Sequence, residues 1–183
     1  MRVISGKARG LKLLAPEGMD TRPTTDRVKE SVFNILMPYL PADSVLDLFA
    51  GSGAMGIEAL SRYCGCCVFV ENNRVSLDII HKNINKAGLS DISKVVQCDA
   101  LSFLSSANSG FDLIFLDPPY NKGFLKPVFK LIHEKNLLNP DGVIVCETEY
   151  NGETISDADF ECIKQAKYGK TVISIFKAET AGK

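Results

Sequence analysis

A glycine-rich turn between a strand and a helix constrains this fold more than any other feature. An apolar run over 44–49 leads into AGSGAMG at 50–56, and a helix is predicted over 54–62. Glycines spaced G-x-G-x-x-G between a strand and a helix are typical of nucleotide-binding folds, because glycine lets the backbone approach a ligand closely. A second apolar strand over 66–70 ends at Glu71, where a carboxylate can accept both hydroxyls of a ribose.

Strands and helices alternate from residue 44 to residue 147. Further helices are predicted over 74–87, 101–105 and 126–135, and further strands over 94–98, 111–116 and 143–147. Residues 161–167 and 171–177 flank a Tyr-Gly-Lys turn and predict a closing antiparallel hairpin. The pattern therefore predicts an α/β fold with a doubly wound, mostly parallel seven-stranded sheet.

The N-terminus predicts a small β-hairpin with a basic tip. Its strands are expected over 2–4 and 11–14. The loop between them, 6–10, begins and ends with a glycine. An exposed basic loop can neutralise RNA phosphates, although a solvated loop fits the composition equally well. The candidate RNA-binding residues precede the first acidic residue, Glu17, and are Arg2, Lys7, Arg9 and Lys12.

A helix is predicted to follow a linker over 16–23. Thr24 or Thr25 can cap it, and Asp26 lies in the first turn, where the helix dipole favours an anion. An apolar face recurs at helical spacing, and Pro38 ends the helix. This helix either covers the sheet or closes over a bound ligand with its first turn.

Asp117-Pro118-Pro119-Tyr120 directly follows the strand at 111–116. Two consecutive prolines have no N–H, so the strand must end there, at the sheet edge where α/β folds bind ligands. The exocyclic amine of a nucleobase is a poor nucleophile, and acceptors on its two hydrogens favour the more nucleophilic pyramidal form. Asp117 and the Pro118 carbonyl could be those acceptors, and Tyr120 could stack on an extruded base. A plain strand-to-helix turn is the alternative.

Composition excludes several classes of protein. The net charge is −1, so nucleic-acid binding requires a local basic patch. No apolar run is long enough to span a membrane, and no signal-peptide core follows Met1. The cluster Cys64-Gly65-Cys66-Cys67 lacks a second cysteine pair and a nearby histidine, so we expect reduced packing cysteines, no metal site and a cytoplasmic protein.

Two cofactor classes fit a glycine turn with an acid after the second strand: a nicotinamide dinucleotide and S-adenosylmethionine. Asp47 lies within the first strand, and Glu71, Asp99 and Asp117 end three others. Carboxylates attract the sulfonium and ammonium of S-adenosylmethionine and repel a pyrophosphate. The acids therefore favour the cationic cofactor, although dinucleotide enzymes also carry the acid of the second strand.

These motifs resemble a known family. DLFAGSG at 47–53 together with Asp117-Pro118-Pro119-Tyr120 resembles methyltransferases that modify exocyclic nitrogens of nucleobases. RVISGKARG at 2–10 and TRPTTDRVKE at 21–30 resemble the RsmD family, the bacterial 16S ribosomal RNA guanine-N2 methyltransferases. The resemblance extends from residue 1 to about residue 177 and implies a Rossmann-like methyltransferase fold. It makes 41–183 the methyltransferase domain and 1–40 an RNA-contacting hairpin with a cofactor lid, packed as one unit.

The resemblance also implies residue roles. Asp47, Phe49, Gly51 and Gly53 would line the methionine part of the cofactor, and Glu71 would hold the ribose. The adenine would lie against Asn72, Asp99 and Ala100. The cofactor would be covered by Arg22, Pro23, Thr24 and Thr25. The target guanine would be held by Asp117, Pro118, Pro119 and Tyr120. The partner would be 16S rRNA in an assembling small ribosomal subunit, and we expect a monomer.

Three alternatives remain at this stage. A methyltransferase for adenine N6 would use the same turn. An NAD-dependent oxidoreductase would need a catalytic His, Lys or Tyr, and no such arrangement stands out. A non-catalytic RNA-binding assembly factor would have no need of an intact Asp-Pro-Pro-Tyr turn.

Overall fold

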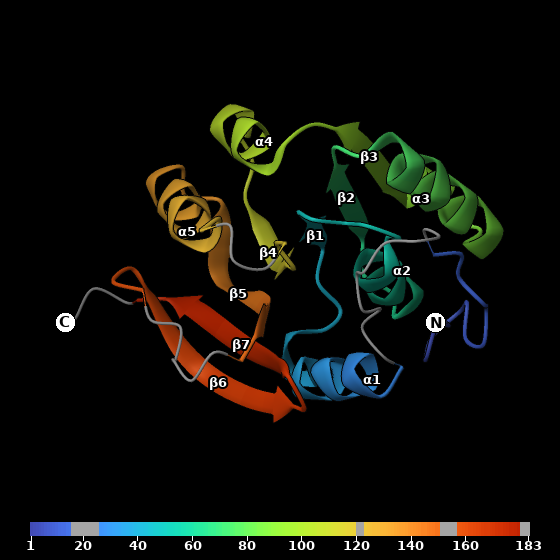
Figure 1. The fold of residues 1–183 in the computed structure, drawn as a ribbon, viewed down its shortest axis with the longest axis horizontal. Coiled ribbons are helices and arrows are strands. Elements are labelled where there is room, and N and C mark those ends of the chain that lie inside the picture. The colour runs from blue at the N-terminus through green and yellow to red at the C-terminus, as the bar shows by residue number, and fades with distance from the viewer. Residues whose placement is uncertain (16–25, 120–122, 151–156, 180–183) are drawn as a thin grey trace.

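A seven-stranded sheet lies at the centre of the molecule (Figure 1). The computed structural model describes residues 1–15, 26–119, 123–150 and 157–179. The strand order is β3-β2-β1-β4-β5-β7-β6, with β1 to β5 parallel and β6 and β7 antiparallel. The strands are β1 (Ser44–Asp47), β2 (Cys66–Glu71), β3 (Ser93–Gln97), β4 (Phe111–Leu116), β5 (Leu138–Glu149), β6 (Phe160–Tyr168) and β7 (Thr171–Ala178). The predicted fold class is confirmed.

The helices cover both faces of the sheet. On one face lie α1 (Asp26–Ile35), α2 (Ala54–Ser61) and α3 (Arg74–Ala87), and on the other α4 (Ala100–Ser106) and α5 (Leu125–Glu134), as Figure 1 shows. Two short 3₁₀ turns, Met37–Tyr39 and Ser90–Ile92, complete the helical elements of the described residues. Each face has its own apolar layer, because successive side chains of a strand point to opposite sides.

The predicted N-terminal hairpin forms, but its pairing is short: one antiparallel bridge between Arg2 and Lys12, with backbone hydrogen bonds from Val3 to Leu11 and from Leu13 to Met1. The reason is that the amides of Ile4, Ser5 and Ala8 donate to side chains of α2 and not to a partner strand. Residues 1–15 are called the N-terminal arm below. Val3 and Leu13 of the arm are buried in the layer of α1, α2 and α3.

Strand β5 starts earlier than predicted. The sequence predicts this strand over 143–147, but the strand begins at Leu138, which pairs with Phe111. The next paired residues are Leu113 and Val143, so the segment between Leu138 and Val143 forms an irregularity inside the strand. The Asn139 side chain stabilises it by donating to a carboxylate oxygen of Asp112 at 2.8 Å.

All six cysteines are free thiols. Cys64 and Cys67 are buried in the layer beneath α1, α2 and α3, and Cys146 is buried in the opposite layer. Burial raises the pKa of all three thiols. Among the described residues, none of the helices is both long and apolar enough to cross a membrane.

Candidate active site

Four carboxylates lie at the carboxyl edge of four adjacent strands. Glu71 ends β2, Asp47 ends β1, Asp117 directly follows β4, and Glu147 lies near the end of β5. Each comes two residues after a side chain of the layer beneath α1, α2 and α3: Phe69, Val45, Phe115 and Val145. Because side chains alternate along a strand, all four carboxylates face the side of the sheet that α2 covers. They are called the carboxylate row below.

The glycine turn wraps around the carboxylate of Glu71. One oxygen accepts from the Gly51 amide at 2.9 Å, and the other accepts from the amides of Asn72 and Asn73 at 2.9 and 2.8 Å. An ionised carboxylate has about four acceptor positions, so one remains for a ribose hydroxyl. Glu71 thus shapes the turn as well as offering a place for a ligand, which sequence reasoning did not foresee.

The three glycines of the turn meet two requirements, a positive φ angle and close packing on the sheet. Gly51 and Gly53 adopt positive φ angles of 55° and 78°, which side chains disfavour. Gly56 lies against β2, where an added Cβ would be 2.4 Å from the Phe69 ring and 2.7 Å from the Cys67 sulfur. Helix α2 therefore packs directly on the sheet and brings its first turn over the strand ends.

Asp47 lies beneath that first turn. Its side chain is buried, and its carboxylate accepts from the Gly56 amide at 3.0 Å. Burial, together with the charge of Glu71, raises the pKa of Asp47 to about 7. Because only 4% of Asp47 is exposed, it can act on a bound cofactor mainly through its charge and through the position of α2.

The structure places the predicted adenine-side residues at the neighbouring strand ends. Asp99 caps α4 by accepting from the Ser102 amide at 3.0 Å, and hydrogen bonding to Ser102 lowers its pKa. Ala100 is buried behind it, while Asn72 is exposed after β2. The Phe49 ring contacts the Phe124 ring edge to face, with centroids 5.9 Å apart, and so links the end of β1 to the start of α5.

Asp117 and the two prolines extend from the end of β4. The Asp117 side chain reaches solvent, whereas Pro118 is buried and Pro119 is exposed. Protein nevertheless surrounds the Asp117 carboxyl closely enough that desolvation raises its pKa well above the usual value, and the charges of Glu147 and Asp47 add to the rise. Of the predicted site residues, Tyr120, Arg22, Pro23, Thr24 and Thr25 lie outside the described residues.

Sequence reasoning missed Glu147. It is 7% exposed and follows Cys146, which pairs with Leu116 immediately before Asp117. The signal was present, since an acid directly follows the apolar run 143–146, as Glu71 follows the run at 66–70. We include Glu147 in the candidate site because its charge contributes to the raised pKa of Asp117.

The predicted RNA-binding residues lie on the N-terminal arm, on the side of the molecule beside α2 and α3 (Figure 1). Lys7, Arg9 and Lys12 are exposed. Arg2 is also exposed, but its guanidinium pairs with Asp26 at 3.1 Å and is therefore shared with α1. Asn83 of α3 ties the arm to the glycine turn, because its amide donates to the carbonyls of Leu14 and Ser52 at 3.0 and 2.9 Å.

Comparison with known proteins identifies the family. A family model described as "Conserved hypothetical protein 95" matches residues 1–177. Ribosomal RNA small subunit methyltransferase D of Escherichia coli is 35% identical, over 100% of this chain and 92% of that protein. The chain belongs to the RsmD family.

Other RsmD-like proteins match over similar lengths. YlbH of Bacillus subtilis is 42% identical over 97% of this chain and 98% of that protein. The solved structure of the Escherichia coli protein yhhF superposes with a TM-score of 0.85 at 34% identity, covering 98% of each chain. The resemblance inferred from the N-terminal segments and the Asp-Pro-Pro-Tyr turn is therefore confirmed.

Among the residues that the structure describes, no cluster of three or more His, Cys, Asp or Glu could hold a metal ion.

Proposed function

We propose that this chain transfers a methyl group from S-adenosylmethionine to the exocyclic N2 amine of a guanine in 16S rRNA. Membership of the RsmD family supports the coarser part, an S-adenosylmethionine-dependent rRNA methyltransferase. The observation that carries the finer part is the position of Asp117, which stands before a buried Pro118 and near the carboxyls of Glu147 and Asp47.

The residues present fit a cationic cofactor. Gly51 and Gly53 carry no side chain that could keep a ligand from the backbone of the turn, and Glu71 keeps about one acceptor position for a ribose hydroxyl. Asn72, Asp99 and Ala100 would border the adenine, and Arg22, Pro23, Thr24 and Thr25 would cover it from the N-terminal side. When bound, S-adenosylmethionine supplies an electrophilic methyl on a sulfonium, a cation that the carboxylate row favours.

Asp117 would act as an acceptor and not as the base. Its carboxylate and the Pro118 carbonyl would take the two hydrogens of the amine, which directs the nitrogen lone pair toward the methyl. Tyr120 would stack on the guanine once the base has left its helix. The N2–methyl bond would form as the bond from the methyl to the sulfonium breaks, with S-adenosylhomocysteine as the leaving group, and the methylated amine would lose its proton to water. Rate acceleration then comes mainly from positioning and preorganised charge. No covalent intermediate with the RNA is needed.

A second acid favours guanine over adenine. The Watson–Crick edge of guanine presents two neighbouring donors, N1–H and the N2 amine, whereas adenine presents an acceptor beside its amine. Glu147 lies beside Asp117, so two carboxylates border the place where that edge would lie. A carboxylate accepts from N1–H of guanine and repels N1 of adenine.

The wider setting belongs to the same proposal. We infer that the substrate is 16S rRNA within an assembling small ribosomal subunit, and that the protein is a cytoplasmic monomer. The basic arm supplies the local patch that a chain of net charge −1 needs to bind RNA.

The test is methyl transfer from labelled S-adenosylmethionine to small-subunit particles that lack this modification, followed by digestion to nucleosides. We expect labelled N2-methylguanosine and no other labelled nucleoside. Labelled N6-methyladenosine would overturn the guanine assignment. Absence of label, with cofactor binding shown by calorimetry, would contradict methylation of the small-subunit RNA and point to another substrate or to a non-catalytic assembly factor.

A further inference from the structure

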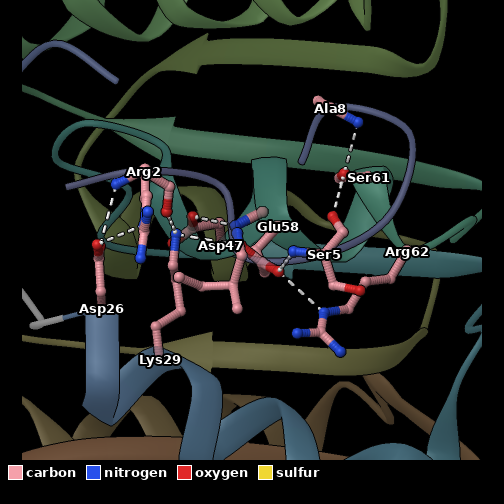
Figure 2. Close-up of polar contacts among 11 residues, drawn as sticks. Arg2, Ser5, Ala8, Asp26, Lys29, Asp47, Glu58, Ser61 and Arg62 are labelled. Carbon is pink, nitrogen blue, oxygen red and sulfur yellow. Dashed lines mark hydrogen bonds and ion pairs between the residues drawn. The ribbon is translucent and has the colours of Figure 1, made fainter. Parts of the chain in front are cut away.

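A buried carboxylate outside the candidate site joins three elements of the fold. Glu58 of α2 is fully buried, and four donors converge on it (Figure 2). One oxygen accepts from the Ile4 amide at 2.7 Å and pairs with the Lys29 ammonium of α1 at 3.1 Å. The other accepts from the Ser5 amide at 3.0 Å and pairs with Arg62 at 2.9 Å. Glu58 thus binds the N-terminal arm, α1 and the end of α2 at one point.

The basic tip of the arm rests on the next turn of α2. The Ser61 hydroxyl donates to the Ser5 carbonyl at 2.6 Å and accepts from the Ala8 amide at 3.0 Å, while its backbone carbonyl accepts from the Lys7 amide at 2.9 Å. Gly6 lies so close that an added Cβ would be 1.7 Å from that carbonyl oxygen. The loop that carries Lys7 and Arg9 is therefore held by its backbone, which leaves both side chains exposed.

The opposite end of α2 belongs to the candidate active site. Gly53 precedes the first residue of α2, and the Gly56 amide donates to Asp47. Helix α2 has only 8 residues, a length of about 12 Å at 1.5 Å per residue. One short helix therefore separates the basic tip from the turn that would hold the cofactor.

A buried ion cluster is an inefficient way to gain stability. Removing the Lys29 and Glu58 charges from water costs free energy, and well-packed apolar side chains often stabilise a core as much or more. Burial lowers the pKa of Lys29, although the charge of Glu58 opposes the shift. The four donors on Glu58 fix the position of the arm relative to α1 and α2 more sharply than apolar contacts would.

We propose that Glu58 is a positioning residue for RNA binding, which holds Lys7 and Arg9 at a set place relative to the cofactor turn so that they contact the RNA backbone. This inference rests on the proposed function, because it takes RNA as the partner of the arm. Glu58 itself touches neither RNA nor cofactor and acts through the arm.

The test is a double-mutant cycle on binding to small-subunit particles that lack the modification. Glu58→Gln places an amide among four donors and should loosen the arm, and Glu30→Gln on the exposed side of α1 is the matched control. We expect Glu58→Gln to weaken particle binding roughly tenfold and to flatten its salt dependence, whereas Glu30→Gln leaves both unchanged. In a Lys7→Ala/Arg9→Ala background, Glu58→Gln should have little further effect, because residues that act as a unit are not additive.

Two results would overturn the inference. Either the Glu58→Gln loss adds in full to the Lys7→Ala/Arg9→Ala loss, or cofactor affinity falls by the same factor as particle affinity, which marks a general structural role. If Glu58→Gln does not fold, Ser61→Ala enters the same cycle with the same expectations. Failure of the wild-type protein to bind cofactor or particles would instead contradict the proposed function, so the two failures are distinguishable.

Discussion

Asp117 and Glu147 lie beside each other at the ends of two adjacent parallel strands, each directly after one of the paired residues Leu116 and Cys146. The two carboxyls are close enough that the charge of Glu147 helps to raise the pKa of Asp117 well above its usual value. Glu147 therefore influences the pH range over which Asp117 can accept hydrogen bonds from an amine.

Replacing Glu147 by Gln should extend methyl transfer to lower pH. Protonation removes the Asp117 charge that strengthens its hydrogen bond from the amine, so activity should fall as pH drops through its pKa, and loss of the Glu147 charge lowers that pKa. The measurement is the pH dependence of kcat, with the exposed Glu149→Gln as a control on the same strand. An acid limb that stays in place, or moves to higher pH, would contradict the coupling.

Replacing Asp117 by Ala should remove catalysis without removing the cofactor. Loss of one preorganised acceptor typically costs about 10²–10³ in kcat, and the contacts of the glycine turn to Glu71 stay intact. Single-turnover kinetics would measure the rate, and calorimetry would measure cofactor affinity. A rate within a few-fold of wild type would refute the role assigned to Asp117.

Asp47 should make the protein less stable as pH rises. Its pKa is about 7 in the folded chain against a usual 3.8, so the folded state holds a proton that the unfolded state has lost between these values. Stability should therefore decline from about pH 4 to about pH 7, by up to about 4 kcal/mol at 1.36 kcal/mol per pKa unit. Urea unfolding at pH 4 and pH 8 measures the decline, and Asp47→Asn, which keeps an oxygen for the Gly56 amide, should reduce it. An equal decline in that variant would rule Asp47 out as its source.

Replacing Gly56 by Ala should destabilise the fold by about 1–3 kcal/mol, the usual cost of overpacking a core. The new methyl would meet the Phe69 ring and the Cys67 sulfur, and both side chains are buried in the core with little room to move. Because α2 must then move off β2, cofactor affinity should also fall. Denaturant unfolding and calorimetry test the two effects, and unchanged stability would show that the sheet yields more easily than its packing suggests.

Replacing Lys7 and Arg9 by Ala should weaken RNA binding and reduce its salt dependence. Each lost phosphate contact lowers the slope of log K against log salt by about 1. Lys126→Ala/Lys130→Ala is a matched control, because it removes two exposed charges from α5 on the opposite face of the sheet. If both double variants behave alike, the arm is not the phosphate contact.

The parallel sheet could be predicted from the sequence because its signals are local. Apolar runs mark the strands themselves, and the glycine turn and the Asp-Pro-Pro-Tyr turn mark where two of them end. The seven strands lie close to where these signals place them. The same locality explains why the N-terminal hairpin and the start of β5 were predicted less closely. The N-terminal segment forms one bridge because its amides bond to α2, a partner far away in sequence.

Charged residues in the interior were harder to predict, both at the candidate site and away from it. Lys29 and Glu58 occupy positions that look like the polar side of an amphipathic helix, yet both are fully buried because each supplies the other's partner. Glu147 was hidden for the opposite reason, since its importance depends on β5 lying next to β4. Pairing across elements, and not residue type, decides these cases.

The buried thiols can report local opening of the two apolar layers. Cys64 and Cys67 lie in one apolar layer and Cys146 in the other, while Cys66 is exposed. Because burial raises the pKa of the three interior thiols, the reactive thiolate is scarce until the surrounding layer opens. Alkylation followed by mass spectrometry would therefore time the opening of each side of the sheet separately, with Cys66 as the reference for a freely accessible site.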